Sequence, residues 1–324
     1  MCTTWTPRTR ERQQFVLGSN SASETDSPTD TLEELLYKTW TIFGVSTLFN
    51  FHQDEVHLKQ YAKRLREEVA TNLAQEDVMY NAKMYIMDNV QTRPSPMDPP
   101  PIKVEVYARK YSHEESTEKC IYTGMLLSWK TINKELTIPN CIRLPLLLCR
   151  GTKSCMKIVH NVLGHMFDCM VVPLPALEDD LIWLVPIVIA PVNNEEHLKH
   201  TDKICMEYKM TKPSDTDTII LNFQVSDLIK MLTVIIKDQS DDENDGISFD
   251  LEHIEKYREV LHTQMLQIAG LQIGLCMLCK IHLPVFTIME NRMKVRNMDI
   301  MNRVLLYLNQ KALDIFHTLN FEIF

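Results

Sequence analysis

The stretch KTWTIFGVSTLFNFHQDEVHLKQYAKRL, residues 38–65, contains the two patterns that decide the fold class. Its first part, 40–51, is an apolar run rich in aromatic and β-branched residues, which is typical of a strand. Its second part opens the segment 55–69, where Leu58, Ala62, Leu65 and Val69 recur at helical spacing among charged residues. The stretch therefore predicts a strand followed by an amphipathic helix.

The rest of the chain repeats these two patterns. Strands are predicted for 102–107, 121–129, 141–149, 182–189, 218–225, 283–289 and 292–296. Helices are predicted for a short segment from Thr31 into Trp40, and for 152–167, 253–279 and 302–316. Because strands and helices cluster without regular βαβ alternation, we predict an α+β fold with antiparallel or mixed sheets and flanking helices.

We expect three parts along the chain. Residues 1–30 read as a disordered tail, because Ser19–Pro28 holds almost nothing that a core would bury. Ser27-Pro28 within it is a candidate for proline-directed phosphorylation or an unmodified part of the tail. An N-terminal α+β region follows over 31–190, and a C-terminal α+β region over 191–324.

Composition limits the classes of function. The 324 residues carry a formal net charge of −9, which argues against a protein that coats nucleic acid with its whole surface. Met1–Arg12 lacks the apolar segment of a signal peptide, so we expect the nine cysteines to be reduced. Val260–Cys279 has no charged residue but is interrupted by His262 and three glutamines, which favours a buried helix over a membrane span.

An acidic segment matches a calcium-binding loop in part. Asp241–Gly246 followed by Glu252 places oxygen ligands at several of the required positions. Glu243 is longer than the usual ligand, and Ser248 replaces an apolar residue. We favour a solvated acidic loop. The alternative function is an α+β ligand-binding or regulatory protein that uses the loop 238–252 in a calcium-like way.

Three groups of residues have spacings that metal or catalytic sites also use. They are Cys276 with Cys279, His197 and His200 with Cys205, and Cys155 with His160 or His165 and Asp168. The first two groups lack the further ligands that zinc needs. The third lies on the packing face of a predicted helix, where sequence proximity does not establish the geometry of a nucleophile and its base. We therefore predict no catalytic site, no metal site and no cofactor.

The segment from Lys280 to Lys311 is the one place where this acidic chain turns basic. On its predicted strand, Arg292, Lys294 and Arg296 alternate with Met293 and Val295, so that the charges share one face. Such a face suits contact with DNA phosphates. It equally suits a solvated edge strand whose charges limit aggregation.

The chain also resembles a known family, the centromere protein L family. The resemblance begins at Lys38, Trp40 and Leu58-Lys59-Gln60-Tyr61. It continues in the same order through Tyr122-Thr123-Gly124, Leu144–Leu148, Gly151, Phe167-Asp168-Cys169, Pro173-Leu174, Leu181-Ile182-Trp183 and Lys280–Leu283.

This resemblance implies a non-enzymatic subunit of the inner kinetochore, located in the nucleus at the centromere and not on a membrane. It implies a heterodimer with a centromere protein N homologue, contacts with other inner kinetochore subunits, and centromeric nucleosome or DNA binding through the complex. In that setting the C-terminal region supplies a partner-binding sheet, with Phe286, Ile288, Met293 and Val295 as candidates for sheet or interface packing. Arg292, Lys294 and Arg296 are the candidates for DNA contact.

Overall fold

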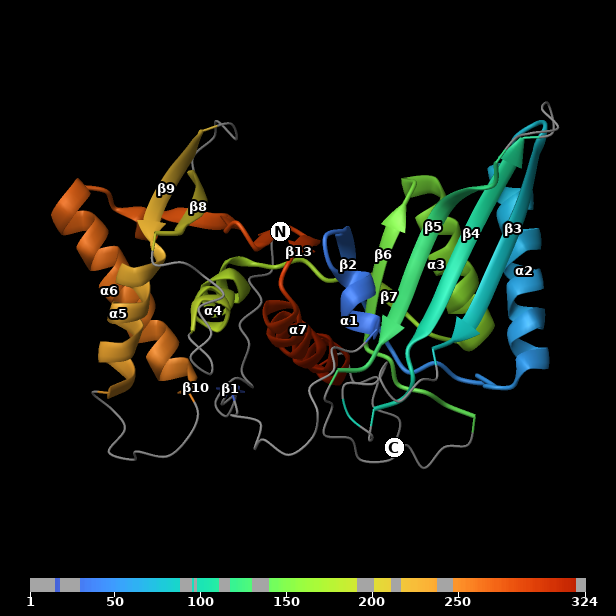
Figure 1. Cartoon of the computed structure of the whole chain (residues 1–324), viewed down its shortest axis with the longest axis horizontal. Helices are drawn as coiled ribbons and strands as arrows, with labels where there is room; N and C mark the ends of the chain where they lie inside the picture. The colour runs from blue at the N-terminus through green and yellow to red at the C-terminus, as the bar shows by residue number, and fades with distance from the viewer. Residues whose placement is uncertain are drawn as a thin grey trace. The chain divides into compact units, whose positions relative to one another are not determined.

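A computed structural model describes residues 15–17, 30–87, 95, 98–110, 117–129, 140–190, 201–210, 217–237 and 247–318. Over these residues the chain forms seven α helices and antiparallel β-sheet (Figure 1). The predicted α+β class is therefore confirmed. The acidic loop 238–246, His197 and His200 lie outside the described residues.

The chain divides into two compact units, which are not continuous in sequence. Unit 1 comprises residues 1–25 and 176–290, and unit 2 comprises 26–175 and 291–324. The sequence patterns predict a boundary at residue 190. The division differs because the segment after residue 175 packs on strands that come a hundred residues later, while the C-terminal segment returns to the first strand of unit 2.

Unit 2 is built on an antiparallel sheet with the strand order β3-β4-β5-β6-β2-β13, and β7 also pairs with β2. Its strands are β2 (Thr39–Val45), β3 (Val78–Ile86), β4 (Ile102–Lys110), β5 (Lys119–Leu127), β6 (Leu146–Gly151), β7 (Val171–Pro173) and β13 (Arg292–Val295). Its helices are α1 (Asp30–Leu35), α2 (Glu55–Leu73), α3 (Lys153–Phe167) and α7 (Met298–Thr318).

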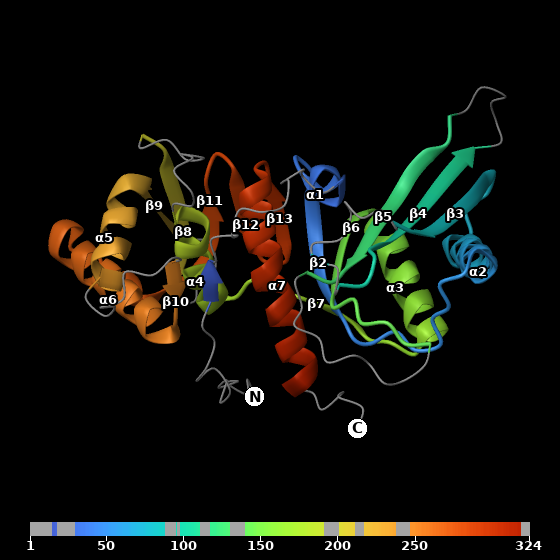
Figure 2. The same ribbon diagram turned by 60° about the horizontal axis from the view of Figure 1, so that its bottom comes forward.

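The residues of β2 alternate between two layers of unit 2. Trp40 and Ile42 are fully buried, and Trp40 lies opposite Met293 of β13 in the register. Helix α7 packs against β2 and β13, as Figure 2 also shows. Phe43 belongs to the other layer, where it packs into the core that α2 and α3 cover. The aromatic and β-branched composition of 40–51 thus supplies apolar residues to both layers.

Caps define the ends of the two covering helices. Asp54 begins α2, where its carboxylate accepts a hydrogen bond from the backbone N–H of His57, and Thr152 begins α3 in the same way. Ala74 and Asp168 end these helices in the left-handed region, at φ 41° and 45°. The helix predicted over 55–69 is confirmed and continues for one more turn.

Unit 1 is built on an antiparallel sheet with the strand order β12-β11-β8-β9. Its elements are α4 (Glu178–Ile189), β8 (Lys203–Met210), β9 (Thr218–Gln224), α5 (Val225–Lys237), α6 (Leu251–Ala269), a 3-10 turn η2 (Ile273–Leu275), β11 (Cys276–His282) and β12 (Phe286–Met289). A separate two-stranded pair joins β1 (Phe15–Leu17) to β10 (Ile247–Phe249). Within the segment 1–30 that we expected to be disordered, the structure describes Phe15–Leu17, which forms β1, and Asp30, which begins α1.

Three predictions of secondary structure are wrong, one in the type of element and two in where a helix ends. The segment 182–189, predicted as a strand, lies in helix α4, where every residue from Leu184 to Ile189 is buried. A helix that is buried all round shows no polar face, so its period cannot be recognised in the sequence. The N–H of Leu177 bonds to Oδ2 of Asp180 at 2.8 Å and marks the start of this helix.

The helix predicted over 253–279 ends early. It stops at Ala269 because Gly270 adopts φ +66°, a left-handed conformation that ends helices. Cys276 and Cys279 consequently lie on strand β11 and not at the end of a helix. Likewise, the helix predicted to run from Thr31 into Trp40 ends at Leu35, and Trp40 lies in β2.

Among the described residues, no helix has the length and apolar character that crossing a membrane requires.

Candidate partner-binding surface

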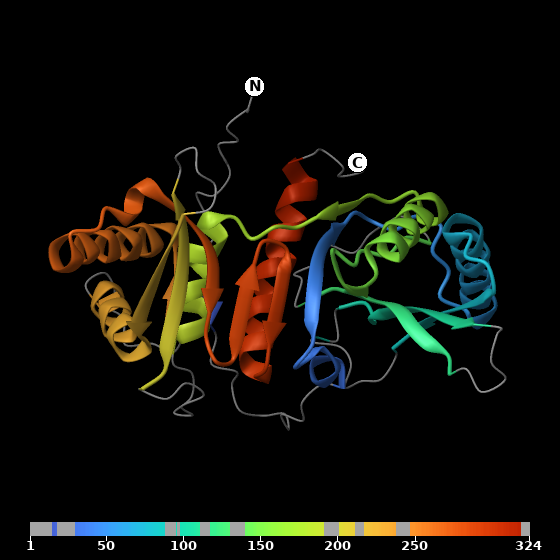
Figure 3. The same ribbon diagram turned by 90° about the horizontal axis from the view of Figure 1, so that it is seen from above.

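The sheet of unit 1 has one covered face and one open face. Helices α4, α5 and α6 lie on the same side of β8, β9 and β11 (Figures 1 and 3). The side chains toward these helices are buried, and they alternate along β8 as Ile204, Met206 and Tyr208. No described helix covers the opposite face.

The register aligns four residues across the open face. In strand order they are Met289 of β12, Lys280 of β11, Glu207 of β8 and Ile220 of β9. Lys280 and Glu207 form an ion pair of 3.0 Å in the middle of the row. Ile220 and Met289 at its ends are 57% and 39% exposed. The open face thus combines a neutralised centre with exposed apolar ends.

Exposed apolar side chains are concentrated in unit 1. Nine of the fourteen exposed large apolar side chains among the described residues belong to this unit, although it is the shorter one. They are Leu177, Met210, Ile220, Val234, Leu266, Ile268, Leu275, Met277 and Met289. Val234, Leu266 and Ile268 lie on helices, whereas Ile220, Met277 and Met289 lie on strands of the sheet. An exposed apolar patch on one face marks a surface that another molecule covers.

Strand β9 also leaves one edge of this sheet open. It pairs with β8 on one side, and no described strand pairs with its other side. Its residues alternate between exposed and half-buried from Thr218 to Gln224. An unpaired edge presents backbone N–H and C=O groups that a partner strand can bond. We call the open face and this edge the unit 1 docking surface.

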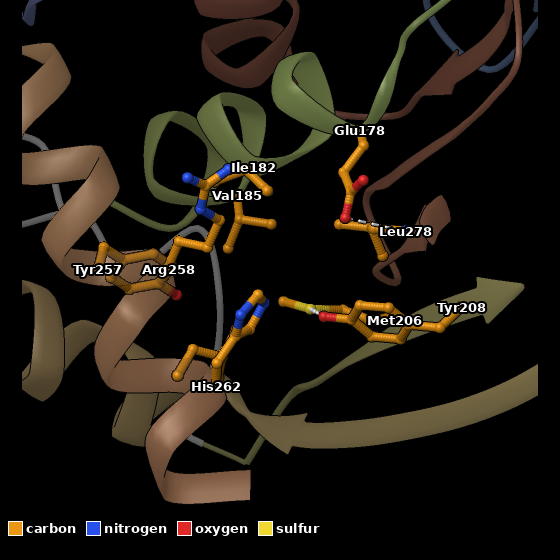
Figure 4. Close-up of a pocket in the computed structure, with 10 residues that line it drawn as sticks. Glu178, Ile182, Val185, Met206, Tyr208, Tyr257, Arg258, His262 and Leu278 are labelled. Carbon is orange, nitrogen blue, oxygen red and sulfur yellow. Dashed lines mark hydrogen bonds between the residues drawn. The ribbon is translucent and has the colours of Figure 1, made fainter. Parts of the chain in front are cut away.

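The covered side of the sheet holds a small cavity, which Figure 4 shows between α4, α6, β8 and β11. Its volume is about 10 Å³, enough for one water molecule and too small for an organic ligand. The hydroxyl of Tyr257 is buried here without a hydrogen-bond partner among the described residues. Burial also raises the pKa of Glu178, whose carboxylate accepts a bond from the N–H of Leu278 at 3.4 Å. The cavity is thus not a candidate for a substrate site.

The four side chains proposed for sheet or interface packing lie in the interior. Phe286, Ile288, Met293 and Val295 are at most 1% exposed. They belong to strands β12 and β13, and a partner cannot reach these side chains while the core stays closed. The interface role stays a prediction.

The proposed DNA-contact residues face solvent to different degrees. Arg292 and Arg296 are exposed and Lys294 is half-buried. Arg292 and Lys294 lie opposite Thr41 and Thr39 of β2. None of the three side chains has an ion-pair partner among the described residues that would neutralise its charge.

The catalytic group considered from the sequence does not assemble. The structure brings His160 to Cys149, with Nε2 3.7 Å from Sγ, and not to Cys155. Burial raises the pKa of both thiols to about 12 and lowers the pKa of His160 to about 4. These shifts favour a neutral thiol beside a neutral imidazole, whereas a cysteine nucleophile needs a thiolate.

The other cysteine pair is also unsuited to redox or metal chemistry. Cys276 is buried, and Cys279 lies in a β-bulge, where its thiol donates to the backbone oxygen of Glu207 at 3.1 Å. Burial raises the pKa of Cys279. Neither thiol forms a disulfide with another described residue.

Comparison with known protein families shows which family this chain belongs to. The family model for centromere protein L matches residues 34–313, which spans both units. The chain belongs to the centromere protein L family. Curated centromere protein L sequences agree: the protein of Gallus gallus is 30% identical over 157 residues, and those of Homo sapiens and Rattus norvegicus are 25% and 24% identical over 162 and 159 residues. Each match covers 46% of this chain and 45% of the relative, so the chain spans about half the length of the curated relatives it matches.

The residues that carry the resemblance to centromere protein L are mostly core residues. Trp40, Tyr122, Leu147 and Phe167 are all at most 1% exposed. The residues by which the chain resembles centromere protein L therefore belong mainly to the buried core of the fold and not to its surface.

Two surface features escaped the sequence analysis. Ile220 and Met277 lie on the docking surface, but in the sequence they read like any apolar residue of a strand. His52, Asp54 and His57 come together at the start of α2, although their spacing matches none of the metal motifs considered. The sequence did offer one signal for this group, since two histidines and one aspartate fall within the six residues 52–57.

Proposed function

We propose that this chain is a non-enzymatic subunit of the inner kinetochore that pairs with a centromere protein N homologue and binds centromeric chromatin as part of that pair. Membership of the centromere protein L family, over residues 34–313, is the observation that carries the proposal. We place the chain in the nucleus, at the centromere. Imaging of a tagged chain beside a centromere marker tests this location, and a diffuse signal would count against it.

We propose that the partner docks on unit 1. The concentration of exposed apolar side chains and the open edge of β9 support this choice. Phe286 and Ile288 then act indirectly, because their buried side chains hold β12 in the sheet that the partner meets. In this proposal the partner does not touch the side chains of Phe286 and Ile288 directly.

Co-expression with the centromere protein N homologue tests the pairing. Ile220→Lys and Met277→Lys each place a desolvated charge into the docking surface, and we expect at least about 30-fold weaker binding, the effect of losing a 2 kcal/mol contact. Val234→Lys is the matched control, because Val234 is 60% exposed on helix α5 of the same unit.

Each outcome of this experiment is informative. Binding that survives both substitutions but fails with Val234→Lys would move the interface to the helical side. A chain that stays monodisperse and never captures the homologue would remove the main support for the proposal.

We propose that Arg292, Lys294 and Arg296 contact DNA phosphates within the pair. Their unneutralised charges on and beside one strand support this assignment. Each phosphate contact contributes about 0.9 to the slope of log K against log salt. The triple alanine variant should therefore lower that slope by about two to three units.

The matched control removes the same charge elsewhere in unit 2. Lys59, Lys63 and Arg66 lie exposed on α2, and their triple alanine variant should leave the slope unchanged. An equal decrease of the salt slope in both triple variants would indicate a general effect of net charge and not a contact by the β13 residues. An unchanged slope in the first variant would remove the three β13 residues from the DNA interface.

A further inference from the structure

The loop before α2 and the first turn of that helix bring two imidazoles and a carboxylate together. His52, Asp54 and His57 each offer one ligand atom, and these atoms all lie within 4.8 Å of one another. Among the described residues, this is the one group of three or more His, Cys, Asp or Glu side chains with that geometry. His57 and Asp54 are 41% and 51% exposed, so an ion can reach them from solvent.

The surrounding residues fix the loop that carries His52. The hydroxyl of Tyr61 accepts a hydrogen bond from the N–H of His52 at 3.1 Å and donates one to the backbone oxygen of Asn50 at 3.2 Å. The Tyr61 ring packs edge-on against Phe167, with centroids 4.9 Å apart. The backbone of His52 is thus held by a side chain that is anchored in the core.

The helix fixes the other two ligands. The backbone N–H of His57 donates to Oδ1 of Asp54 at 3.0 Å, which leaves Oδ2 for a second partner. That oxygen lies 2.6 Å from Nδ1 of His57. The rings of His52 and His57 stack, with centroids 4.4 Å apart. All three side chains are therefore positioned before any ion binds.

We propose that His52, Asp54 and His57 form a binding site for a divalent transition-metal ion, with Zn²⁺ as the reference ion. Two imidazoles and one carboxylate are a ligand set that suits zinc, nickel or copper, whereas calcium and magnesium require mostly oxygen ligands. Three protein ligands leave a fourth position for water or a ligand from another molecule.

Binding involves a small rearrangement of the hydrogen bond between His57 and Asp54. Ligand atoms around a tetrahedral ion with bonds near 2 Å lie about 3.3 Å apart, so the contact between His57 and Asp54 has to lengthen slightly. The hydrogen bond between Nδ1 and Oδ2 is given up as the ion takes its place, and the neutral imidazole then carries its proton on Nε2. The ion then joins the loop to the helix start, and it should raise the melting temperature of the chain.

Titration of the full-length chain with Zn²⁺ tests the site. We expect one equivalent to bind by calorimetry, and His52→Ala or His57→Ala to weaken binding by at least about 100-fold, the upper range for loss of even an outer-shell partner. Asp54→Ser separates the two roles of Asp54, because serine still caps the helix but offers no carboxylate. It should weaken Zn²⁺ binding while leaving the metal-free melting temperature nearly unchanged.

Controls exclude the other ligands of the chain. His165→Ala removes an exposed imidazole of the same unit and should keep the affinity. Co²⁺ in place of Zn²⁺ should give weak visible bands without sulfur-to-metal charge transfer, since no thiol belongs to the site. The proposal is overturned if Zn²⁺ does not bind, if His52→Ala and His57→Ala both bind it as tightly as the natural chain, or if cobalt reports thiolate ligands.

Discussion

The indole N–H of Trp129 donates a hydrogen bond of 2.8 Å to Oδ1 of Asn302, a residue 173 positions later in the chain. Asn309 of the same helix accepts a second bond, of 3.0 Å, from the backbone N–H of Trp129. The two asparagines hold the end of β5 against α7. Hydrogen bonds thereby join the two sequence segments of unit 2, 26–175 and 291–324.

Asn309→Ala should destabilise unit 2. Asn309 is 2% exposed, so the substitution leaves the N–H of Trp129 buried without its partner. An unsatisfied buried group costs about 1–3 kcal/mol. Urea unfolding followed by tryptophan fluorescence measures the loss. The control is Gln310→Ala, which changes an exposed neighbour and should alter the free energy of unfolding by less than about 0.5 kcal/mol. Equal effects of the two substitutions would show that the hydrogen bond from Trp129 to Asn309 does not stabilise unit 2.

The sequence predicted those elements whose pattern has a visible period. Helix α2 alternates a buried stripe of Leu58, Leu65 and Val69 with charged residues, and strand β13 alternates Met293 with Lys294. Both were predicted correctly. Helix α4 was missed because tertiary burial removed its polar face, and the end of α6 was missed because apolar residues continue past Gly270 into the next strand.

Candidate sites were harder to predict, because they depend on contacts across long sequence distances. The alternation of β13 predicted which of its residues face inward, but not that they lie in a closed core. Ile220 reaches the docking surface only because β9 lies at the edge of its sheet, and strand order cannot be deduced from composition. His160 faces Cys149 for a similar reason, since β6 and α3 pack together.

Alkylation should distinguish the cysteines by burial. Cys120 is exposed, whereas burial raises the pKa of Cys149, Cys155 and Cys169 to about 12. Because the thiolate is the reacting form, iodoacetamide at pH 8 should modify Cys120 first and leave the three buried thiols intact. Mass spectrometry of peptides gives the order. In urea all four should react alike, and early modification of Cys149 in the native chain would contradict the burial found here.

Glu34→Ala should loosen α1 from the sheet. Glu34 forms an ion pair with Lys103 of β4, which is 13% exposed and also lies 3.3 Å from Glu105. Burial lowers the pKa of Lys103, but bonds to Glu34 and Tyr85 outweigh it and raise the pKa overall. Loss of one partner of a half-buried ion pair should lower the free energy of unfolding by about 1–2 kcal/mol, which is less than the loss for a fully buried pair.

An exposed ion pair supplies the control for this measurement. Lys59 and Glu55 of α2 lie 2.6 Å apart but are 76% and 81% exposed. Glu55→Ala should therefore leave the free energy of unfolding nearly unchanged in the same chemical denaturation. A double-mutant cycle of Glu34 with Lys103 that gave no coupling energy would show that the pair does not hold α1.

Stability of unit 2 should fall as the pH drops from 6.5 toward 4, and His160 should account for part of the loss. Its ring lies against Phe43, with centroids 4.5 Å apart, and burial lowers its pKa from the ordinary 6.5 to about 4. Between these values the unfolded chain binds a proton that the folded chain does not, so the free energy of unfolding decreases with falling pH, by up to about 3 kcal/mol. His160→Gln should flatten this dependence in urea titrations at a series of pH values. His165→Gln, on an exposed imidazole of the same helix, should leave the slope as it is, and parallel curves for both variants would show that His160 does not control it.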